Sequence, residues 1–193
     1  MLTHEAFEAT EIIVMKASNV LLLPGWQNSR PAHWQSLWQV QFGYQRVEQH
    51  DWLRPLRGDW MARLEEVVLS SDEPTVLVAH SLGCLLVAAW AAHSRHPHRV
   101  KAALLVAPGD AEREDLRALL GSWSPLTQHR LPFKSILVAS RDDPYCSFER
   151  AQVFAAAWGS DLVDGGCLGH INAESGLKDW LPGQELLNTL ITI

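Results

Sequence analysis

The segment from Thr75 to His93 constrains the fold more than any other part of the sequence. A continuous apolar run from Thr75 to Ala79 passes through His80 and Ser81 into a second, longer apolar stretch, Leu82 to His93. The first run is typical of a strand buried on both faces, and the second of a helix buried on most sides. The chain is therefore predicted to turn from a central parallel strand directly into a covering helix, with a serine at the turn.

Strands and helices are expected to alternate along the rest of the chain. The predicted strands are Asn19–Leu23, Tyr44–Trp52, Ala102–Val106, Ser135–Ala139 and Asp161–Val163, and the predicted helices are Pro31–Phe42, Asp59–Leu69 with Asp59 as N-cap, Phe148–Trp158 and Gln184–Leu190. This alternation predicts an α/β protein, a three-layer α/β/α sandwich with a mostly parallel sheet. We expect one domain over residues 18–193 after an N-terminal extension over 1–17, and a small insertion above the sheet within 109–133.

Composition excludes several classes of function. The 193 residues include 16 Lys and Arg against 22 Asp and Glu, a net charge of −6 that gives no basic footprint for nucleic acid. The longest apolar run, Cys84 to Ala92, falls far short of the ~20 residues of a membrane helix. The N-terminus lacks the basic start of a signal peptide, and the three cysteines are widely spaced, which fits reduced thiols. We therefore expect a cytoplasmic protein with neither nucleic acid nor membrane as partner.

Ser81 lies in an A-x-S-x-G pattern that begins at Ala79 and ends at Gly83. Small residues on both sides of the serine allow the tight strand-to-helix turn that projects a nucleophilic hydroxyl clear of a sheet. Alanine in place of the usual first glycine is a mild departure, because it adds only a Cβ. The alternative role for Ser81 is to cap an ordinary helix.

An acid and a histidine follow Ser81 in the order that this turn requires of a catalytic triad. Asp142 and Asp143 come just after a strand, at the sheet edge where parallel sheets bind ligands. Pro144 fixes the turn after Asp143, so Asp143 is the predicted acid and Asp142 the alternative; either could instead cap the next helix. His170 is the predicted base, on a glycine-rich loop that can reach back across the edge, although alone it could simply bond to backbone.

Acyl transfer also requires two backbone N–H groups that bind the developing oxyanion. Leu82 is expected to supply one, and Trp26 or Gln27, after the first strand, the other; a plain turn is the alternative there. Gln27, Trp34 and His80 are candidate substrate-binding residues. Core packing is the more ordinary role for Trp34, and local hydrogen bonding for His80.

Neither a metal nor a cofactor is expected. Cys167 and His170 are three residues apart but lack the further ligands that a metal requires, and the glycine-rich phosphate loops are absent. A cysteine nucleophile at Cys146 or Cys167 would lack the strand-to-helix turn that Ser81 has.

Five stretches carry a resemblance to a known family: LLLPGWQNSRPAHWQSLW (Leu21–Trp38), VLVAHSLGC (Val76–Cys84), LVAPGD (Leu105–Asp110), SRDDPYCSFERA (Ser140–Ala151) and GHIN (Gly169–Asn172). They are similar to the serine hydrolases of the α/β-hydrolase fold typified by retinoblastoma-binding protein 9 and its small bacterial relatives. The resemblance implies a compact sheet with a minimal lid or none, and Ser81, Asp143 and His170 as the triad. It supplies no substrate, and the absence of an L-x-C-x-E stretch carries over no retinoblastoma interaction.

Together these features predict a serine hydrolase that cleaves a small to medium ester, thioester or amide, a small-molecule substrate, through an acyl-enzyme. One alternative is an interaction module that keeps the fold with little turnover, since a fold does not determine a function. Another is an acyltransferase or lyase that uses the same turn. The ordered placement of serine, acid and histidine favours the hydrolase.

Overall fold

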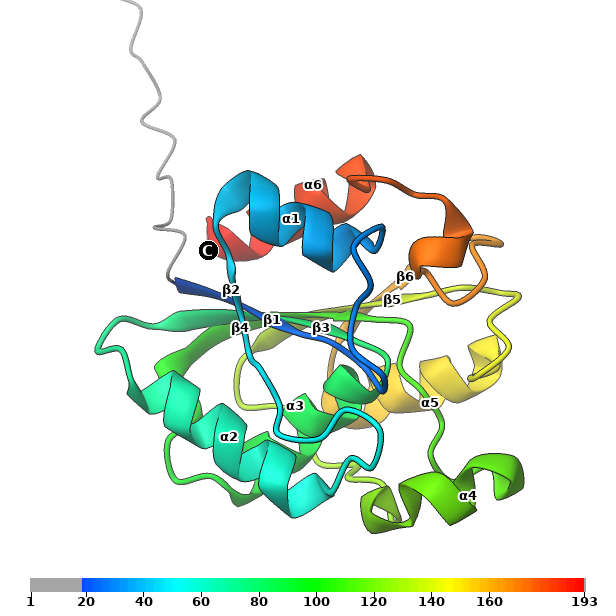
Figure 1. Ribbon diagram of the computed structural model, residues 1–193, viewed down its shortest axis with the longest axis horizontal. Coiled ribbons are helices and arrows are strands. Elements are labelled where there is room, and N and C mark those ends of the chain that lie inside the picture. The colour runs from blue at the N-terminus through cyan, green and yellow to red at the C-terminus, as the bar shows by residue number, and fades with distance from the viewer. Residues whose placement is uncertain (1–18, 193) are drawn as a thin grey trace, which may run out of the picture.

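A six-stranded parallel sheet forms the centre of the computed structural model, which describes residues 19–192 (Figure 1). Its strands are β1 (Val20–Leu23), β2 (Gln45–Arg46), β3 (Thr75–His80), β4 (Val100–Val106), β5 (Lys134–Ala139) and β6 (Asp161–Asp164). They lie in the order β2-β1-β3-β4-β5-β6, and every neighbouring pair is parallel. The carboxyl ends of all six strands therefore meet at one edge, where the candidate residues of the sequence lie.

Helices cover both faces of this sheet, as Figure 1 shows. One face carries α1 (Trp34–Phe42) and α6 (Leu181–Ile191), and the other carries α2 (Arg57–Leu69), α3 (Leu82–His93) and α5 (Phe148–Trp158). A shorter helix, α4 (Glu114–Leu120), lies outside this second helical layer near α5. The three layers confirm the predicted α/β sandwich.

The alternation of side chains along β3 explains how one strand contributes residues to two hydrophobic clusters, one on each face of the sheet. Val76 and Val78 pack in the hydrophobic cluster beneath α1 and α6, whereas Leu77 and Ala79 pack in the cluster beneath α2, α3 and α5. Successive side chains of a strand point to opposite faces, so a strand buried on both sides must be apolar throughout. The nine residues from Leu82 to Trp90 in α3 are likewise all buried.

Two sequence predictions differ from the structure. The predicted strand Tyr44–Trp52 reduces to Gln45–Arg46, because β2 is an edge strand and pairs on one side only. Asp59 is not an N-cap, because α2 begins at Arg57. Asp59 lies in the first turn of this helix, where its negative charge interacts favourably with the positive end of the helix dipole.

The stretch 109–133 is where a small insertion above the sheet is predicted. It contains α4 and a short 3-10 helix, η3 (Gly121–Trp123), whose Trp123 is buried and donates its indole N–H to the Pro55 carbonyl at 2.9 Å. The extension predicted over 1–17 lies outside the described residues.

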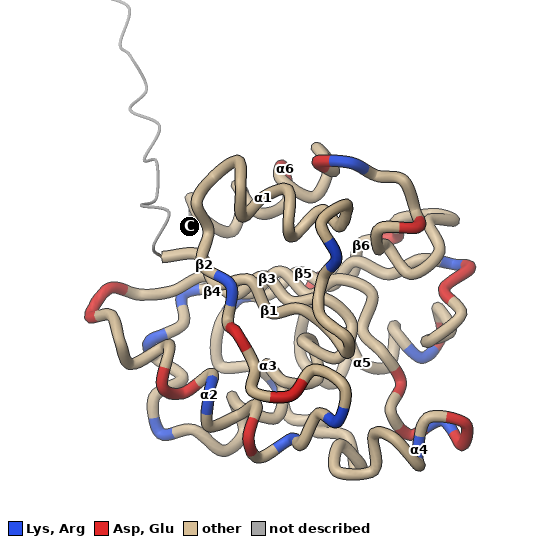
Figure 2. The backbone as a smooth tube through the Cα atoms, in the orientation of Figure 1, with Lys and Arg blue, Asp and Glu red and all other residues tan. Residues whose placement is uncertain are grey.

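Charged residues of both signs are interspersed around the loops and outer helices (Figure 2). None of the helices between residues 19 and 192 has both the length and the apolar character that a membrane crossing requires.

Candidate active site

Ser81 occupies a strained turn between β3 and α3. Its backbone has φ 54° and ψ −119°, a conformation that non-glycine residues rarely adopt, and its N–H donates to the Val106 carbonyl at 3.0 Å. Two glycines make room for it: a Cβ on Gly25 would lie 2.7 Å from the Ser81 Cβ, and one on Gly83 would lie 2.2 Å from the Leu23 carbonyl oxygen. The small residues around the serine are therefore required by close backbone approach.

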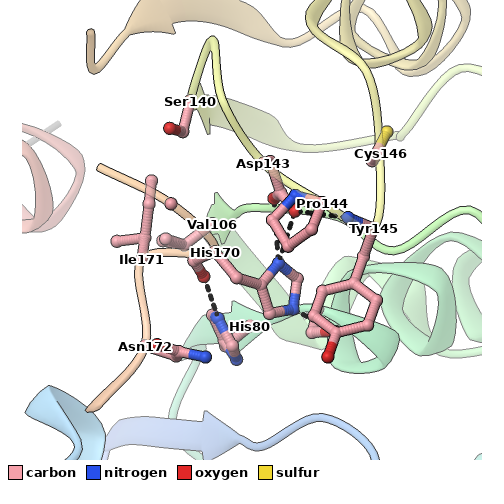
Figure 3. Close-up of polar contacts among 12 residues, drawn as sticks. His80, Val106, Ser140, Asp143, Pro144, Tyr145, Cys146, His170, Ile171 and Asn172 are labelled. Atoms are coloured by element: carbon pink, nitrogen blue, oxygen red, sulfur yellow. Dashed lines mark hydrogen bonds and ion pairs between the residues drawn. The ribbon is translucent and has the colours of Figure 1, made fainter. Parts of the chain in front are cut away.

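Ser81, His170 and Asp143 form a continuous chain of hydrogen bonds, of which Figure 3 shows the contact between His170 and Asp143. The Ser81 Oγ lies 2.9 Å from His170 Nε2, and His170 Nδ1 lies 2.8 and 3.0 Å from the two Asp143 carboxylate oxygens. A carboxylate only accepts, so Nδ1 carries the proton and leaves Nε2 to accept from the serine hydroxyl. The Tyr145 ring packs edge-on against the His170 imidazole, with the two ring centroids 4.6 Å apart, and restricts rotation of the imidazole.

Asp142, the alternative acid, does not contact the His170 ring. Its Oδ1 accepts hydrogen bonds from the Ser140 hydroxyl at 2.7 Å and from the Gly169 N–H at 2.8 Å. These bonds hold the pKa of Asp142 below its usual range, the Ser140 hydroxyl first and the Gly169 N–H second. The structure therefore brings Asp143, and not Asp142, to His170.

Two further histidines pack in line behind His170. The His80 and His170 rings are 4.8 Å apart, and the His33 ring lies 4.7 Å beyond that of His80. Burial places the pKa of His80 well below its ordinary value, and its Nε2–H donates to the His170 carbonyl at 2.9 Å. His80 thus fixes the backbone of His170, a contact that its place next to Ser81 in the sequence does not reveal.

His33 is the N-cap of α1, where its Nδ1 accepts the Gln35 N–H at 3.1 Å. Burial, with a smaller contribution from the Arg46 charge, lowers the pKa of His33 from 6.5 to about 3. The ring is therefore neutral near pH 7, with its proton on Nε2. The sequence signal for this role is a polar residue directly before a helix.

Two backbone N–H groups are free beside Ser81. Within residues 19–192, no acceptor engages the N–H of Trp26 or that of Leu82, the first residue of α3. Gln27, the alternative donor, already donates its N–H to the Trp52 carbonyl at 3.0 Å. The geometry therefore leaves Trp26 and Leu82 as the pair available to an oxyanion.

A cleft of about 240 Å³ opens over Ser81 and includes Gln27 and His80 among its lining residues. Trp34 is not part of this lining: it is 1% exposed, packs against Trp38 and Trp180, and donates its indole N–H to the Ile171 carbonyl at 2.8 Å. Core packing is therefore its observed role. The described residues contain no group of three or more metal-ligating side chains.

The sheet, the strained serine turn and the Ser81–His170–Asp143 contacts define an α/β-hydrolase fold with a serine centre. A family model described as "Serine hydrolase" matches residues 20–189, so the chain belongs to that serine hydrolase family. A YdeN-like hydrolase of Pectobacterium atrosepticum is 31% identical, with 89% of each chain covered and a TM-score of 0.79.

Two other solved structures extend the likeness of fold. The ydeN gene product of B. subtilis is 22% identical over 90% of this chain and 98% of that chain, with a TM-score of 0.71. Est1E of Butyrivibrio proteoclasticus, solved with ferulic acid bound, is 13% identical over 90% of this chain and 89% of that chain, with a TM-score of 0.66. A search of curated proteins found no match.

Proposed function

We propose that the protein is an acyl hydrolase that cleaves small to medium esters, thioesters or amides through a triad of Ser81, His170 and Asp143. The observation that carries the proposal is the 2.9 Å contact between Ser81 Oγ and His170 Nε2, with Asp143 held on the opposite ring nitrogen. A serine hydroxyl is a weak nucleophile until a positioned base accepts its proton, and this contact supplies that base.

The reaction proceeds in two halves. Ser81 Oγ attacks the substrate carbonyl while His170 takes the hydroxyl proton, and the Trp26 and Leu82 N–H groups stabilise the oxyanion. His170 then donates that proton to the departing alcohol, thiol or amine, which leaves an acyl ester on Ser81. Water, deprotonated by His170, hydrolyses the ester, releases the acid and restores the free enzyme.

A fluorophosphonate probe tests the nucleophile. The probe should label the native protein on Ser81, and Ser81→Ala should abolish both labelling and ester hydrolysis. Ser147→Ala, at the exposed N-cap of α5, is the matched control and should keep both. Labelling that persists in Ser81→Ala would refute the proposal.

We further propose that the chain lies near the retinoblastoma-binding protein 9 branch of its family, and that it works in the cytoplasm without a cofactor. The first suggestion rests on the stretch Leu21–Trp38, whose Trp26, His33 and Gln35 all take part in the site or its support. The cytoplasmic location rests on its three unpaired cysteines. The proposal needs no cofactor because a serine triad carries out acyl transfer with protein groups alone.

A further inference from the structure

The cleft over Ser81 has two chemically different walls. The apolar wall belongs to the α3 side and consists of Leu82, Leu85, Ala111, Leu116 and Leu120. The polar wall comes from the turn after β1, the start of α1 and the segment after His170, and consists of Gln27, Asn28, Arg30, His33, Asn172 and Glu174. Figure 1 shows α4 and the segment after β6 on opposite sides of the sheet edge.

A buried N–H without an acceptor lies in the polar wall. His33 is 4% exposed, its Nδ1 is engaged by the Gln35 N–H, and its Nε2 meets no partner among the described residues. Leaving such a donor unsatisfied is unfavourable, and native structures rarely do so without a reason. An oxygen acceptor on a bound molecule would supply the missing partner.

Asn172 provides a second donor on the same wall. Its Oδ1 is occupied by the Glu174 N–H at 2.9 Å, at the N-cap of the 3-10 helix η4 (Ala173–Ser175). Its side-chain amide N–H groups have no partner within the described chain, and Figure 3 shows the amide nitrogen directed toward His80.

The charges of the polar wall balance. Arg30 and Glu174 are both exposed, and neither forms an ion pair with a described residue. Asp110, elsewhere in the cleft lining, is already paired with Arg150 at 3.2 Å. A wall of donors and acceptors with one charge of each sign suits an uncharged polar group better than an anion or a cation.

The position of His170 decides which half of a substrate meets which wall. His170 must deliver its proton to the leaving group, so the leaving group lies on the His170 side of Ser81. Asn172 and Glu174 lie two and four residues after His170 in the chain, and the His80 ring lies between the rings of His33 and His170. The leaving group therefore meets the polar wall, and the acyl group meets the leucines of α3 and α4.

We infer that the cleft selects esters of an apolar acid with a small, uncharged, hydroxylated alcohol, whose oxygens accept hydrogen bonds from His33 and Asn172. The inference rests on the proposed hydrolase function. In the reaction the ester C–O bond breaks, the alcohol leaves with the proton from His170, and water supplies the OH of the released acid and the proton that restores Ser81.

Four butanoate esters that differ only in the alcohol test this selectivity: glycerol, butan-1-ol, choline and 3-hydroxypropanoate. Initial rates of acid release give kcat/KM for each. We expect kcat/KM for the glycerol ester to be about tenfold higher than for the butyl ester, the effect of one hydrogen bond gained. It should also be higher than kcat/KM for either charged ester. A preference for the butyl ester or for either charged ester would overturn the inference.

Two variants assign the selectivity to the polar wall. His33→Asn and Asn172→Ser each keep a side-chain oxygen that can cap the local helix, but the donor that remains on the shorter side chain no longer lies at the position of the His33 Nε2–H or the Asn172 amide N–H. Each should lower the ratio of glycerol to butyl ester toward one, while Glu149→Gln, on the exposed side of α5, should keep the native ratio. An unchanged ratio in both variants would refute the role of the wall. Failure of the hydrolase proposal would look different, since no ester would turn over and Ser81 would not be labelled.

Discussion

The carboxylate of Asp142 accepts a hydrogen bond of 2.8 Å from the N–H of Gly169, the residue that precedes His170. Its neighbour Asp143 instead binds the His170 imidazole itself. Two consecutive aspartates thus hold the same histidine in two ways, one through the backbone of its loop and one through its ring. Only the contact of Asp143 changes the proton distribution on the ring, because it fixes the proton on Nδ1.

This division predicts unequal effects of the same substitution. Asp143→Asn should lower kcat by roughly 10⁴-fold, as loss of the orienting acid does in serine triads, because the amide can hold the wrong tautomer. Asp142→Asn should lower kcat by less than about tenfold, since its amide oxygen still accepts the Gly169 N–H. Ester hydrolysis and the rate of fluorophosphonate labelling measure both. Equal losses in the two variants would contradict the assignment.

A second prediction concerns the glycine that supports the serine turn. Gly83→Ala would place a Cβ 2.2 Å from the Leu23 carbonyl oxygen, so β1 or α3 must shift, and we expect the free energy of unfolding to fall by about 3 kcal/mol. Gly58→Ala, in the first turn of α2, meets nothing within 4 Å and should raise it by about 0.5–1 kcal/mol. Urea denaturation compares the two. A Gly83→Ala protein as stable as the native one would rule out the close approach.

The central elements were predictable because nearly all of their residues are apolar. A strand such as β3, apolar on both faces, must lie between two layers of helices, and a helix such as α3, apolar on most sides, must be covered by its neighbours. The edge strand β2 was not predictable at its true length, because its residues are partly exposed and their pairing depends on one neighbour.

The candidate site was predictable as an order of residue types, but not as a set of contacts. Ser81, Asp143 and His170 follow from their places after strands, yet the choice between Asp142 and Asp143 depends on how the 165–169 loop folds over the sheet edge. The same limit applies to Trp34, whose helical spacing favours a core residue but does not exclude a cleft residue. Its burial against Trp180 depends on the residue that precedes α6, far along the chain.

The neutral His33 predicts how stability depends on pH. An unfolded chain protonates this histidine below about pH 6.5, whereas the folded chain keeps it neutral down to about pH 3. The unfolded state therefore binds more protons in that window, and His33 makes the free energy of unfolding fall by about 1.4 kcal/mol for each unit that the pH drops.

His33→Asn removes this contribution, so its stability should decline less steeply than that of the native protein. Urea midpoints at about pH 7, 5.5 and 4.5 measure both slopes across the window. His80, whose pKa is also depressed by burial, acts in the same direction and remains in both proteins. Identical slopes for the two proteins would show that His33 titrates normally in the folded state.

The cysteines provide the last prediction, because a thiol must ionise to act as a nucleophile. Burial raises the pKa of Cys84 above its ordinary value and raises that of Cys146 to about 12, whereas Cys167 is exposed. Iodoacetamide at about pH 8 should therefore modify Cys167 alone in the native protein, as read by peptide mass spectrometry. All three cysteines should react in urea, which serves as the control. Fluorophosphonate labelling of Ser81 should survive in Cys167→Ser; its loss there, or rapid modification of Cys146 in the native protein, would favour a cysteine nucleophile over the serine.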